Sequence, residues 1–330
     1  MAAVLIYGAT GYTGRLACEY AQKIGLEFSV GARSETTVRE LAPSLKVVDY
    51  YAFAVTDQNA IDTALQGKRV LLNCAGPFFR TAKPLIEACI RNGVHYLDVA
   101  AELDSYRLAE ELDGRAQEAG VMLMPGCGGS VAMLGCLADY ILRGVSGASS
   151  IDISLHVSGS MSKGSAISAS ENMTAETLQR SRGQLIPQNT TDIKDFNFAD
   201  GRGIVSSSPV TLPDLITLWK STGVNNIRTY VNISGGAFPT SNLDALPAGP
   251  SHEELDANPY HVAVQVMDSN GTTHSAVLHT VNGYTFTSQA SIEAVKLVLA
   301  GHSRPGFQTP AEIFGYHFAQ RISGSVFKTV

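Results

Sequence analysis

The sequence has little charge and lacks several features that would assign it to common functional classes. Only 16% of its 330 residues are charged, the formal net charge is −6, and tryptophan occurs once. No cluster of basic residues is present, which argues against a nucleic-acid-binding surface. The first apolar stretch, VLIY, is too short for a signal peptide or a membrane span. We therefore expect a cytoplasmic protein with no membrane partner.

Cysteine and histidine do not occur in metal-binding or disulfide patterns. The five cysteines are odd in number and have no CxxC spacing, so neither a disulfide framework nor a zinc site is expected. The eight histidines show no close ligand spacing. The sequence predicts no metal site.

Apolar segments of strand length alternate with amphipathic, helix-length segments through residues 1–148. This alternation is typical of βαβ units, and it predicts a Rossmann-type doubly wound parallel sheet. The predicted strands are VLIYG (4–8), EFSVGAR (27–33), KVVDYYAFAV (46–55), RVLLNCAG (69–76), VHYLDVAA (94–101) and VMLMPG (121–126).

The pattern changes near residue 148, where strands become polar on one face. HVAVQVMD (261–268) and HSAVLHTV (274–281) predict an antiparallel hairpin around the turn Ser269-Asn270-Gly271. We predict an α/β protein whose second domain, 149–290, is α+β with a mixed or antiparallel sheet. Residues 291–330 are predicted to be helical and to pack back on the first domain; their apolar content is equally compatible with a homodimer.

The segment GATGYTG follows the first predicted strand directly and opens a predicted helix. In that position Gly8 would form the tight turn, Gly11 would admit the pyrophosphate of a dinucleotide, and Gly14 would let the helix pack on the strand. The site includes the neighbouring Thr10, Tyr12 and Thr13. A purely structural turn is the alternative.

Two further segments extend this candidate cofactor site. The second strand ends in Arg33 and Ser34 without an acidic residue, which favours the 2′-phosphate of NADP over NAD, although Arg33 can also be a solvated side chain. Cys74, Ala75, Gly76 and Pro77 follow the fourth strand, where they would run along the nicotinamide ribose or form a plain strand-to-helix turn.

Taken together, GATGYTG, VGARS, NCAGPF, GVHYLDVAAE, PGCGGSVAMLG and TPAEIFG resemble the saccharopine dehydrogenase-like oxidoreductases. The middle of the chain resembles them only in SGSMSKGSAIS. Two segments depart from the family pattern: Ala101 stands where glycine is common, and PGCGGSVAMLG lacks the usual aspartate and proline. The resemblance implies NAD(P)-dependent hydride transfer and a substrate bound between two domains.

Hydride transfer requires a group that donates a proton to the substrate or stabilises developing charge. Tyr96 and Asp98 alternate onto one face of the fifth strand, so a buried carboxylate oriented by a tyrosine is predicted there, with helix capping as the alternative for Asp98. Lys163 lies in the serine- and glycine-rich turn and is a candidate for binding a carboxylate or protonating a carbonyl; a solvated lysine is its alternative.

Three residues are predicted to contact substrate. Glu102 follows the fifth strand, Cys127 lies in the turn Gly126-Cys127-Gly128-Gly129, and Ser130 begins the next helix. Each also has a structural alternative: a helix start for Glu102, a small residue in a tight turn for Cys127, and a helix cap for Ser130.

These observations predict an NADP-dependent oxidoreductase that reduces a C=N, C=O or conjugated C=C bond of a small or medium organic molecule. A redox-neutral isomerase or cyclase, and a non-catalytic dinucleotide sensor or scaffold, are the alternatives.

Overall fold

The computed structural model describes residues 2–172, 176–235 and 246–330, with no side-chain description for 169–172. The chain forms two compact units. The first comprises Met1–Gly129 and Thr287–Thr309, and the second comprises Ser130–Phe286 and Pro310–Val330. No helix in the described ranges is both long and apolar enough to cross a membrane.

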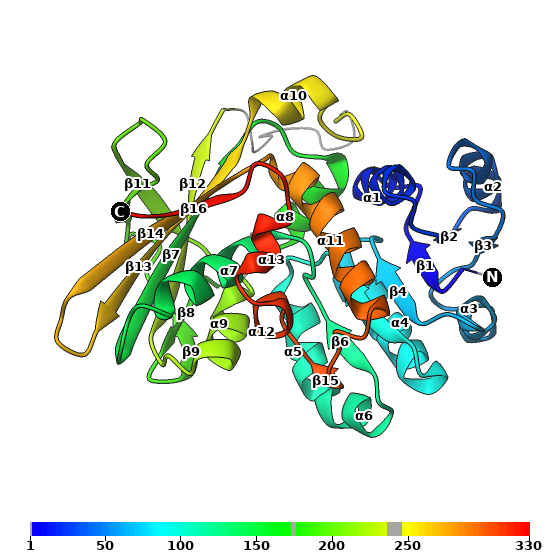
Figure 1. Cartoon of the computed structure of the whole chain (residues 1–330), viewed down its shortest axis with the longest axis horizontal. Helices are drawn as coiled ribbons and strands as arrows, with labels where there is room; N and C mark the ends of the chain where they lie inside the picture. The colour runs from blue at the N-terminus through cyan, green and yellow to red at the C-terminus, as the bar shows by residue number, and fades with distance from the viewer. Residues whose placement is uncertain (1, 173–175, 236–245) are drawn as a thin grey trace. The chain divides into compact units, whose positions relative to one another are not determined.

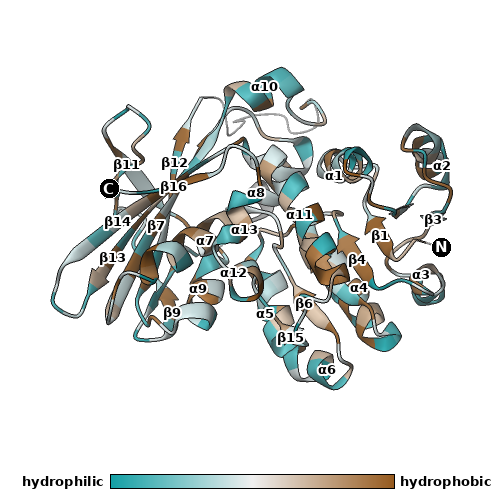
Figure 2. Ribbon diagram, in the orientation of Figure 1, coloured by the Kyte–Doolittle hydropathy of each residue, from teal (hydrophilic) through white to brown (hydrophobic). Residues whose placement is uncertain are grey.

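A seven-stranded parallel sheet forms the centre of the first unit (Figure 1). Its strands, in spatial order, are β15 (Gly306–Phe307), β6 (Met122–Met124), β5 (His95–Asp98), β4 (Val70–Asn73), β1 (Val4–Tyr7), β2 (Ser29–Ala32) and β3 (Tyr50–Ala52). Every residue of β1 and β4 is buried, and both strands are coloured as hydrophobic in Figure 2. Strands buried on both faces tend to be continuous apolar runs, which made β1 and β4 visible in the sequence, whereas β3 was recognised although Tyr50 and Ala52 are exposed.

Helices lie between consecutive strands from β1 to β6, as in a doubly wound fold. They are α1 (Tyr12–Lys23), α2 (Glu35–Ser44), α3 (Gln58–Leu65), α4 (Phe78–Asn92), α5 (Leu103–Glu111) and α6 (Asp113–Glu118). The predicted Rossmann sheet is confirmed. The short edge strand β15, which pairs with β6 in parallel, was not predicted.

The second unit is built on a mixed sheet, as predicted. Its main path is β10 (Lys194–Asn197), β11 (Ile204–Pro209), β12 (Ile227–Ser234), β7 (Ala148–Ser158), β13 (Tyr260–Asp268), β14 (Thr273–Thr280) and β16 (Val326–Thr329), and β8 (Leu178–Ser181) and β9 (Gln184–Pro187) attach beside β12. β12 and β7 pair in parallel, whereas β13 and β14 form the predicted antiparallel hairpin.

The two faces of this second sheet differ in chemistry. Ile151, Ile153 and Leu155 of β7 are buried on the face against which α7 (Ser130–Leu142) packs. The alternate residues, which include Asp152 and His156, point to the opposite face. One face therefore forms the core with α7, and the other carries Asp152 and His156 together with a second buried apolar cluster of Phe196, Phe198, Tyr230, Ala263 and Val277.

The remaining helices are α8 (Lys163–Asn172), α9 (Asp214–Thr222), α10 (His252–Ala257), α11 (Gly283–Leu299), α12 (Pro310–Phe314) and α13 (His317–Gln320). The unit boundaries differ from the expected domain limits of 148 and 290. The first boundary lies at Gly129, because α7 packs on the second sheet. The C-terminal segment is divided: residues through Thr309 belong to the first unit, and the rest, including β16, to the second.

Candidate dinucleotide-binding site

The loops after β1 and β4 meet at the point where the strand order of the first sheet reverses. β1 pairs with β2 on one side and with β4 on the other. The Cys74 N–H donates to the Tyr7 carbonyl over 2.8 Å, and a Cβ built on Gly8 would lie 2.6 Å from the Ala75 nitrogen. Open α/β sheets bind ligands at this switch point, outside the carboxyl ends of the strands.

The three glycines of the first loop have three different environments. Gly8 has a positive φ of 81°, and its N–H donates to the Gly31 carbonyl over 2.8 Å, so it forms the turn. A Cβ on Gly14 would overlap the Gly8 carbonyl oxygen. Gly11 is exposed, and a Cβ built on it meets one atom within 4 Å, the Gly8 oxygen at 3.3 Å. Of the three glycines, Gly11 alone is exposed to solvent, and a Cβ on it would make one close contact, with the Gly8 oxygen.

Helix α1 begins directly after Gly11 without a side-chain cap. Gly11 is the N-cap residue, and Tyr12 and Thr13 are the first two residues of the helix, both half-buried. The Thr10 carbonyl accepts a hydrogen bond from Arg15 Nε over 3.2 Å, which holds the loop against the first turn. The N–H groups of an uncapped first turn bind anions, and the helix dipole reinforces this.

Arg33 and Ser34 follow β2 at the same edge of the sheet, and both are exposed. Ser34 is the N-cap of α2: its hydroxyl accepts the Thr37 N–H over 3.4 Å. Among the described residues, Arg33 interacts electrostatically with Tyr7 and makes no ion pair. Its guanidinium is therefore available for an anionic ligand.

Asn73, the last residue of β4, fixes the loop that follows it, which consists of Cys74, Ala75, Gly76 and Pro77. The Asn73 Oδ1 accepts the Ala75 N–H over 3.0 Å, and Thr81 Oγ1 donates to the Ala75 carbonyl over 2.6 Å. The Gly76–Pro77 peptide is cis. Asn73 was not among the predicted site residues; its place at the end of a buried strand, just before this loop, was the available signal.

Asp98, Tyr96 and Asn73 form a buried hydrogen-bonded chain across β5 and β4. The Tyr96 hydroxyl donates to Asp98 Oδ2 over 2.8 Å and accepts from Asn73 Nδ2 over 3.1 Å. The Asp98 Oδ1 accepts the N–H groups of Ala100 at 2.9 Å and Gly126 at 2.8 Å. All three side chains are completely buried. This geometry makes Asp98 and Tyr96 positioning residues for the loops after β4, β5 and β6; direct contact with substrate stays a prediction.

Burial alters the acidity of this chain. Desolvation raises the pKa of Asp98 to about 6, against the lowering effect of its hydrogen bonds from Ala100, Gly126 and Tyr96. Desolvation, and then the neighbouring Asp98 charge, raise the pKa of the Tyr96 hydroxyl well above its ordinary value. Tyr96 therefore stays protonated at neutral pH and donates its hydrogen bond to the carboxylate.

Glu102 and Cys127 also lie in the first unit, and both are buried. The Glu102 carboxylate accepts the N–H groups of Phe78 at 3.1 Å and Phe79 at 2.8 Å, so it holds the start of α4. Burial, followed by the charge of Asp98, raises the pKa of the Cys127 thiol well above its usual range, and the Cys127 N–H donates to the Asp98 carbonyl. A neutral thiol is a poor nucleophile, so Cys127 fits a packed turn.

Ser130 and Lys163 lie in the second unit. Ser130 is the first residue of α7 and is half-buried. Lys163 begins α8, where its N–H donates to the Ala248 carbonyl over 3.2 Å. The turn before it is fixed by Tyr284, whose hydroxyl accepts the Ser162 N–H over 2.8 Å. Tyr284 was also missed, because nothing in the sequence connects it to a turn so far away in the chain.

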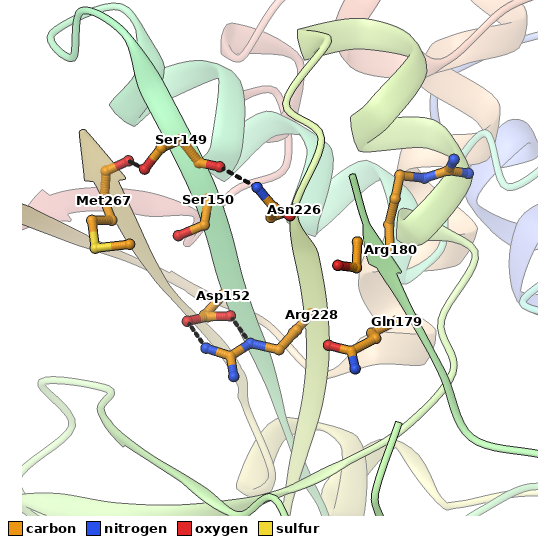
Figure 3. Close-up of a pocket in the computed structure, with 9 residues that line it drawn as sticks. Ser149, Ser150, Asp152, Gln179, Arg180, Asn226, Arg228 and Met267 are labelled. Carbon is orange, nitrogen blue, oxygen red and sulfur yellow. Dashed lines mark hydrogen bonds and ion pairs between the residues drawn. The ribbon is translucent and has the colours of Figure 1, made fainter. Parts of the chain in front are cut away.

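A separate surface pocket of about 440 Å³ lies on the second sheet (Figure 3). At this pocket, Arg228 Nε and Nη2 each donate a hydrogen bond of 2.7 Å to the Asp152 carboxylate. Lys194 Nζ lies 2.7 Å from the same carboxylate. The residues that line the pocket are Ser149, Ser150, Asp152, Gln179, Arg180, Ser181, Asn226, Arg228 and Met267. None of the predicted site residues is among them, and the carboxylate is already paired.

Comparison with known proteins matches the first unit to a known cofactor-binding domain. Residues 4–124 match the family model of the saccharopine dehydrogenase NADP binding domain. These residues, which form most of the first unit, are similar to that domain. The predicted resemblance is confirmed, and the switch-point loops described above lie within or next to the matched residues.

Relatives match part of this chain at low identity. The chain is 28% identical over 138 residues to the "Lipid droplet localized protein" of Caenorhabditis elegans and 26% identical over 132 residues to the "Trans-acting enoyl reductase" of Mycobacterium leprae. Each alignment covers 38% of this chain and 32% of the relative, so the match takes in about a third of each relative's length.

A solved structure matches the whole chain. Saccharopine dehydrogenase (L-Glu forming) from Saccharomyces cerevisiae aligns over 99% of both chains with a TM-score of 0.68 and 15% sequence identity. At this identity the likeness concerns the fold. The parallel sheet and the mixed second sheet therefore occur together in a known fold.

Proposed function

We propose that the protein is an NADP-dependent oxidoreductase that reduces a C=N, C=O or conjugated C=C bond of a small or medium organic molecule. The observation that carries the proposal is the exposed Gly11 at the uncapped start of α1, at the switch point of a parallel sheet. The family match of residues 4–124 and the name of the mycobacterial relative support it.

In this proposal the chain's own groups bind and position. The N–H groups at the start of α1 bind the pyrophosphate beside Gly11, and Arg33 binds the 2′-phosphate. Asn73 fixes the backbone of Ala75, along which the nicotinamide ribose lies. Bound NADPH supplies the hydride. The Asp98–Tyr96–Asn73 chain holds the loops that surround the site.

The choice of NADP over NAD rests on the end of β2. Arg33 and Ser34 are exposed there. Neither residue carries a carboxylate that could accept a hydrogen bond from a ribose 2′-hydroxyl, and the first acidic residue after β2 is Glu35. Guanidinium groups bind phosphate with paired, charge-assisted hydrogen bonds. We expect NADPH to bind more tightly than NADH.

The first experiment is a fluorescence titration of the purified full chain with NADPH and with NADH. Tighter binding of NADPH supports the assignment, and binding of neither overturns it. NADPH oxidation is then followed at fixed cofactor with panels of imines, ketones and enones. Product formation from a panel member without NADPH consumption would identify a redox-neutral enzyme instead, and NADPH binding with no turnover of any panel would favour a sensor.

A further inference from the structure

Three histidines form a row across adjacent strands of the second sheet. His156 of β7 lies directly opposite His261 of β13, and His261 lies directly opposite His279 of β14. Residues in register on neighbouring strands point to the same face. The His156 and His261 rings are stacked with centroids 5.5 Å apart, and those of His261 and His279 lie 4.6 Å apart. This face is opposite α7, and on it the His156 ring also contacts the buried Phe198 ring.

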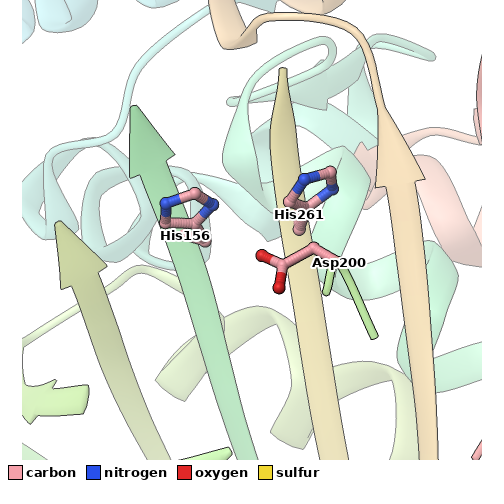
Figure 4. A group of neighbouring side chains, drawn as sticks. All are labelled: His156, Asp200 and His261. Carbon is pink, nitrogen blue, oxygen red and sulfur yellow. The ribbon is translucent and has the colours of Figure 1, made fainter. Parts of the chain in front are cut away.

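Asp200 joins the first two of these histidines from a different element. It lies in the turn between β10 and β11, which pair up to Asn197 and Ile204. One ring nitrogen each of His156 and His261 and one carboxylate oxygen of Asp200 all lie within 4.8 Å of one another. Figure 4 shows the three side chains gathered around one space beside the strands. The ligand atoms of one tetrahedral zinc ion lie about 3.4 Å apart, so side-chain rotations must bring these three atoms closer together to place each ~2.0–2.2 Å from the ion.

The imidazole rings of His156 and His261 each have a ring nitrogen that makes no hydrogen bond to the described residues. The Nδ1 atoms of both His156 and His261 are buried and have no hydrogen-bond partner within the described part of the chain. Nε2 of His156 is 2.8 Å from Ser234 Oγ. When Nε2–H donates to that hydroxyl, Nδ1 carries a bare lone pair, which is the usual arrangement of a metal-binding histidine with its second nitrogen hydrogen-bonded.

The two Nδ1 atoms without a partner are shielded from solvent. A buried ring nitrogen with no partner is costly unless something satisfies it.

We propose that His156, His261 and Asp200 form a binding site for a divalent transition-metal ion, zinc in particular. Two imidazole nitrogens and one carboxylate oxygen are donors that zinc accepts, and they leave a fourth tetrahedral position for water or an exogenous ligand. The ion fixes the β10–β11 turn to the centre of the sheet, because one ligand comes from the turn and two come from the strands beneath it.

Arg202 is part of this arrangement and not a competitor for it. The Arg202 guanidinium is paired with Asp200 Oδ2 at 2.7 Å. The backbone N–H of Arg202 donates to Asp200 Oδ1 over 3.1 Å. A carboxylate has about four lone-pair sites, so it can accept these bonds and bind an ion. Ligating carboxylates are commonly held in this way by hydrogen bonds from outside the metal's coordination shell. His279 is differently engaged, since its Nε2 donates to the Phe198 carbonyl over 2.7 Å.

The test is calorimetric titration of the untagged full chain with ZnCl₂ after exhaustive dialysis against a chelator. We expect one zinc ion to bind per chain. His261→Ala and His156→Ala should each weaken binding by more than about 100-fold, beyond the loss that follows removal of an outer-shell partner. His274→Ala is the matched control: His274 lies on β14, paired with Asp268 at 3.0 Å, away from the cluster, and this variant should bind zinc as the unaltered chain does.

Circular dichroism establishes that each variant is folded, and X-ray absorption of the zinc-loaded unaltered chain gives a readout that needs no variant. Two imidazole nitrogens and at least one oxygen around the ion support the proposal. The proposal is overturned if the unaltered chain binds no zinc, if His274→Ala loses it equally, or if the spectrum shows fewer than two imidazoles.

Discussion

The Glu102 carboxylate accepts the backbone N–H of Phe79 over 2.8 Å, across the gap between two consecutive crossover connections of the first sheet. Glu102 itself precedes α5, but it caps α4, whose own N-cap residue, Pro77, provides no side-chain hydrogen bond. Its second oxygen accepts the Phe78 N–H over 3.1 Å. A negative charge at a helix start also meets the positive end of the helix dipole. Glu102 therefore fixes the loop after β4, in which the candidate cofactor site lies.

Replacing Glu102 by glutamine should destabilise the protein. An amide keeps one acceptor and turns its NH₂ toward an N–H of α4, so a buried donor loses its partner along with the charge. We expect the free energy of unfolding to fall by about 1–3 kcal/mol. Urea unfolding at pH 7 measures the change. Glu118→Gln, at an exposed position on α6, is the control and should change it by less than about 0.5 kcal/mol. An equal effect of both variants would contradict the capping role.

Gly11→Val should abolish NADPH binding without unfolding the protein. Apart from the chain neighbours of Gly11, the only described atom within 4 Å of a Cβ at this exposed position is the Gly8 oxygen at 3.3 Å, so the side chain enters the space proposed for the pyrophosphate. Gly14→Val is the contrasting variant: its Cβ overlaps the Gly8 carbonyl and should lower the melting temperature. Fluorescence titration and thermal unfolding together separate the two effects. NADPH affinity retained in Gly11→Val would mean that this loop is only structural.

Arg33→Glu should reverse the expected cofactor preference. Loss of a charged hydrogen bond to the 2′-phosphate and its replacement by a repulsive carboxylate should weaken NADPH by about 10- to 100-fold. NADH, which has no such phosphate, should bind nearly as before. Arg39→Glu makes the same charge change at an exposed position on α2 and serves as the control. If NADPH and NADH weaken equally in Arg33→Glu, Arg33 does not bind the phosphate.

The first sheet could be predicted because short, continuous segments of the sequence specify its strands and its first turn. Each buried parallel strand is a continuous apolar run, and Gly8, Gly11 and Gly14 specify the first turn within seven residues. The two-residue strand β15 was missed because it is too short to form a pattern. The hairpin β13–β14 was visible through its Asn270-Gly271 turn.

The contacts between distant segments could not be predicted in the same way. Glu102 was placed at a helix start by its sequence position, but it caps the preceding helix, because the fold brings β4 and β5 side by side. His156 and His261 have no ligand spacing in the sequence; the pairing register of β7 and β13 alone places them opposite each other. Strand register and packing determine which distant residues become neighbours, and neither can be read from a single sequence.

Asp98 should make the stability of the protein depend on pH in the acidic range. Burial raises the pKa of Asp98 in the folded protein from 3.8 to about 6. Folding therefore favours the protonated carboxyl: its contribution to stability is complete below about pH 4 and is lost as the pH rises through about 6. The full change is at most about 3 kcal/mol. In Asp98→Asn this pH-dependent contribution is absent.

The measurement is the free energy of urea unfolding for the unaltered chain and for Asp98→Asn at intervals between pH 4 and pH 7.5. Subtracting the two curves cancels the titration of all other groups that the substitution leaves unchanged. The difference should move in favour of Asp98→Asn as the pH rises, with its midpoint between the two pKa values. A difference that is constant over this range would mean that Asp98 stays ionised throughout. The hydrogen bonds from Tyr96, Ala100 and Gly126 would then outweigh desolvation.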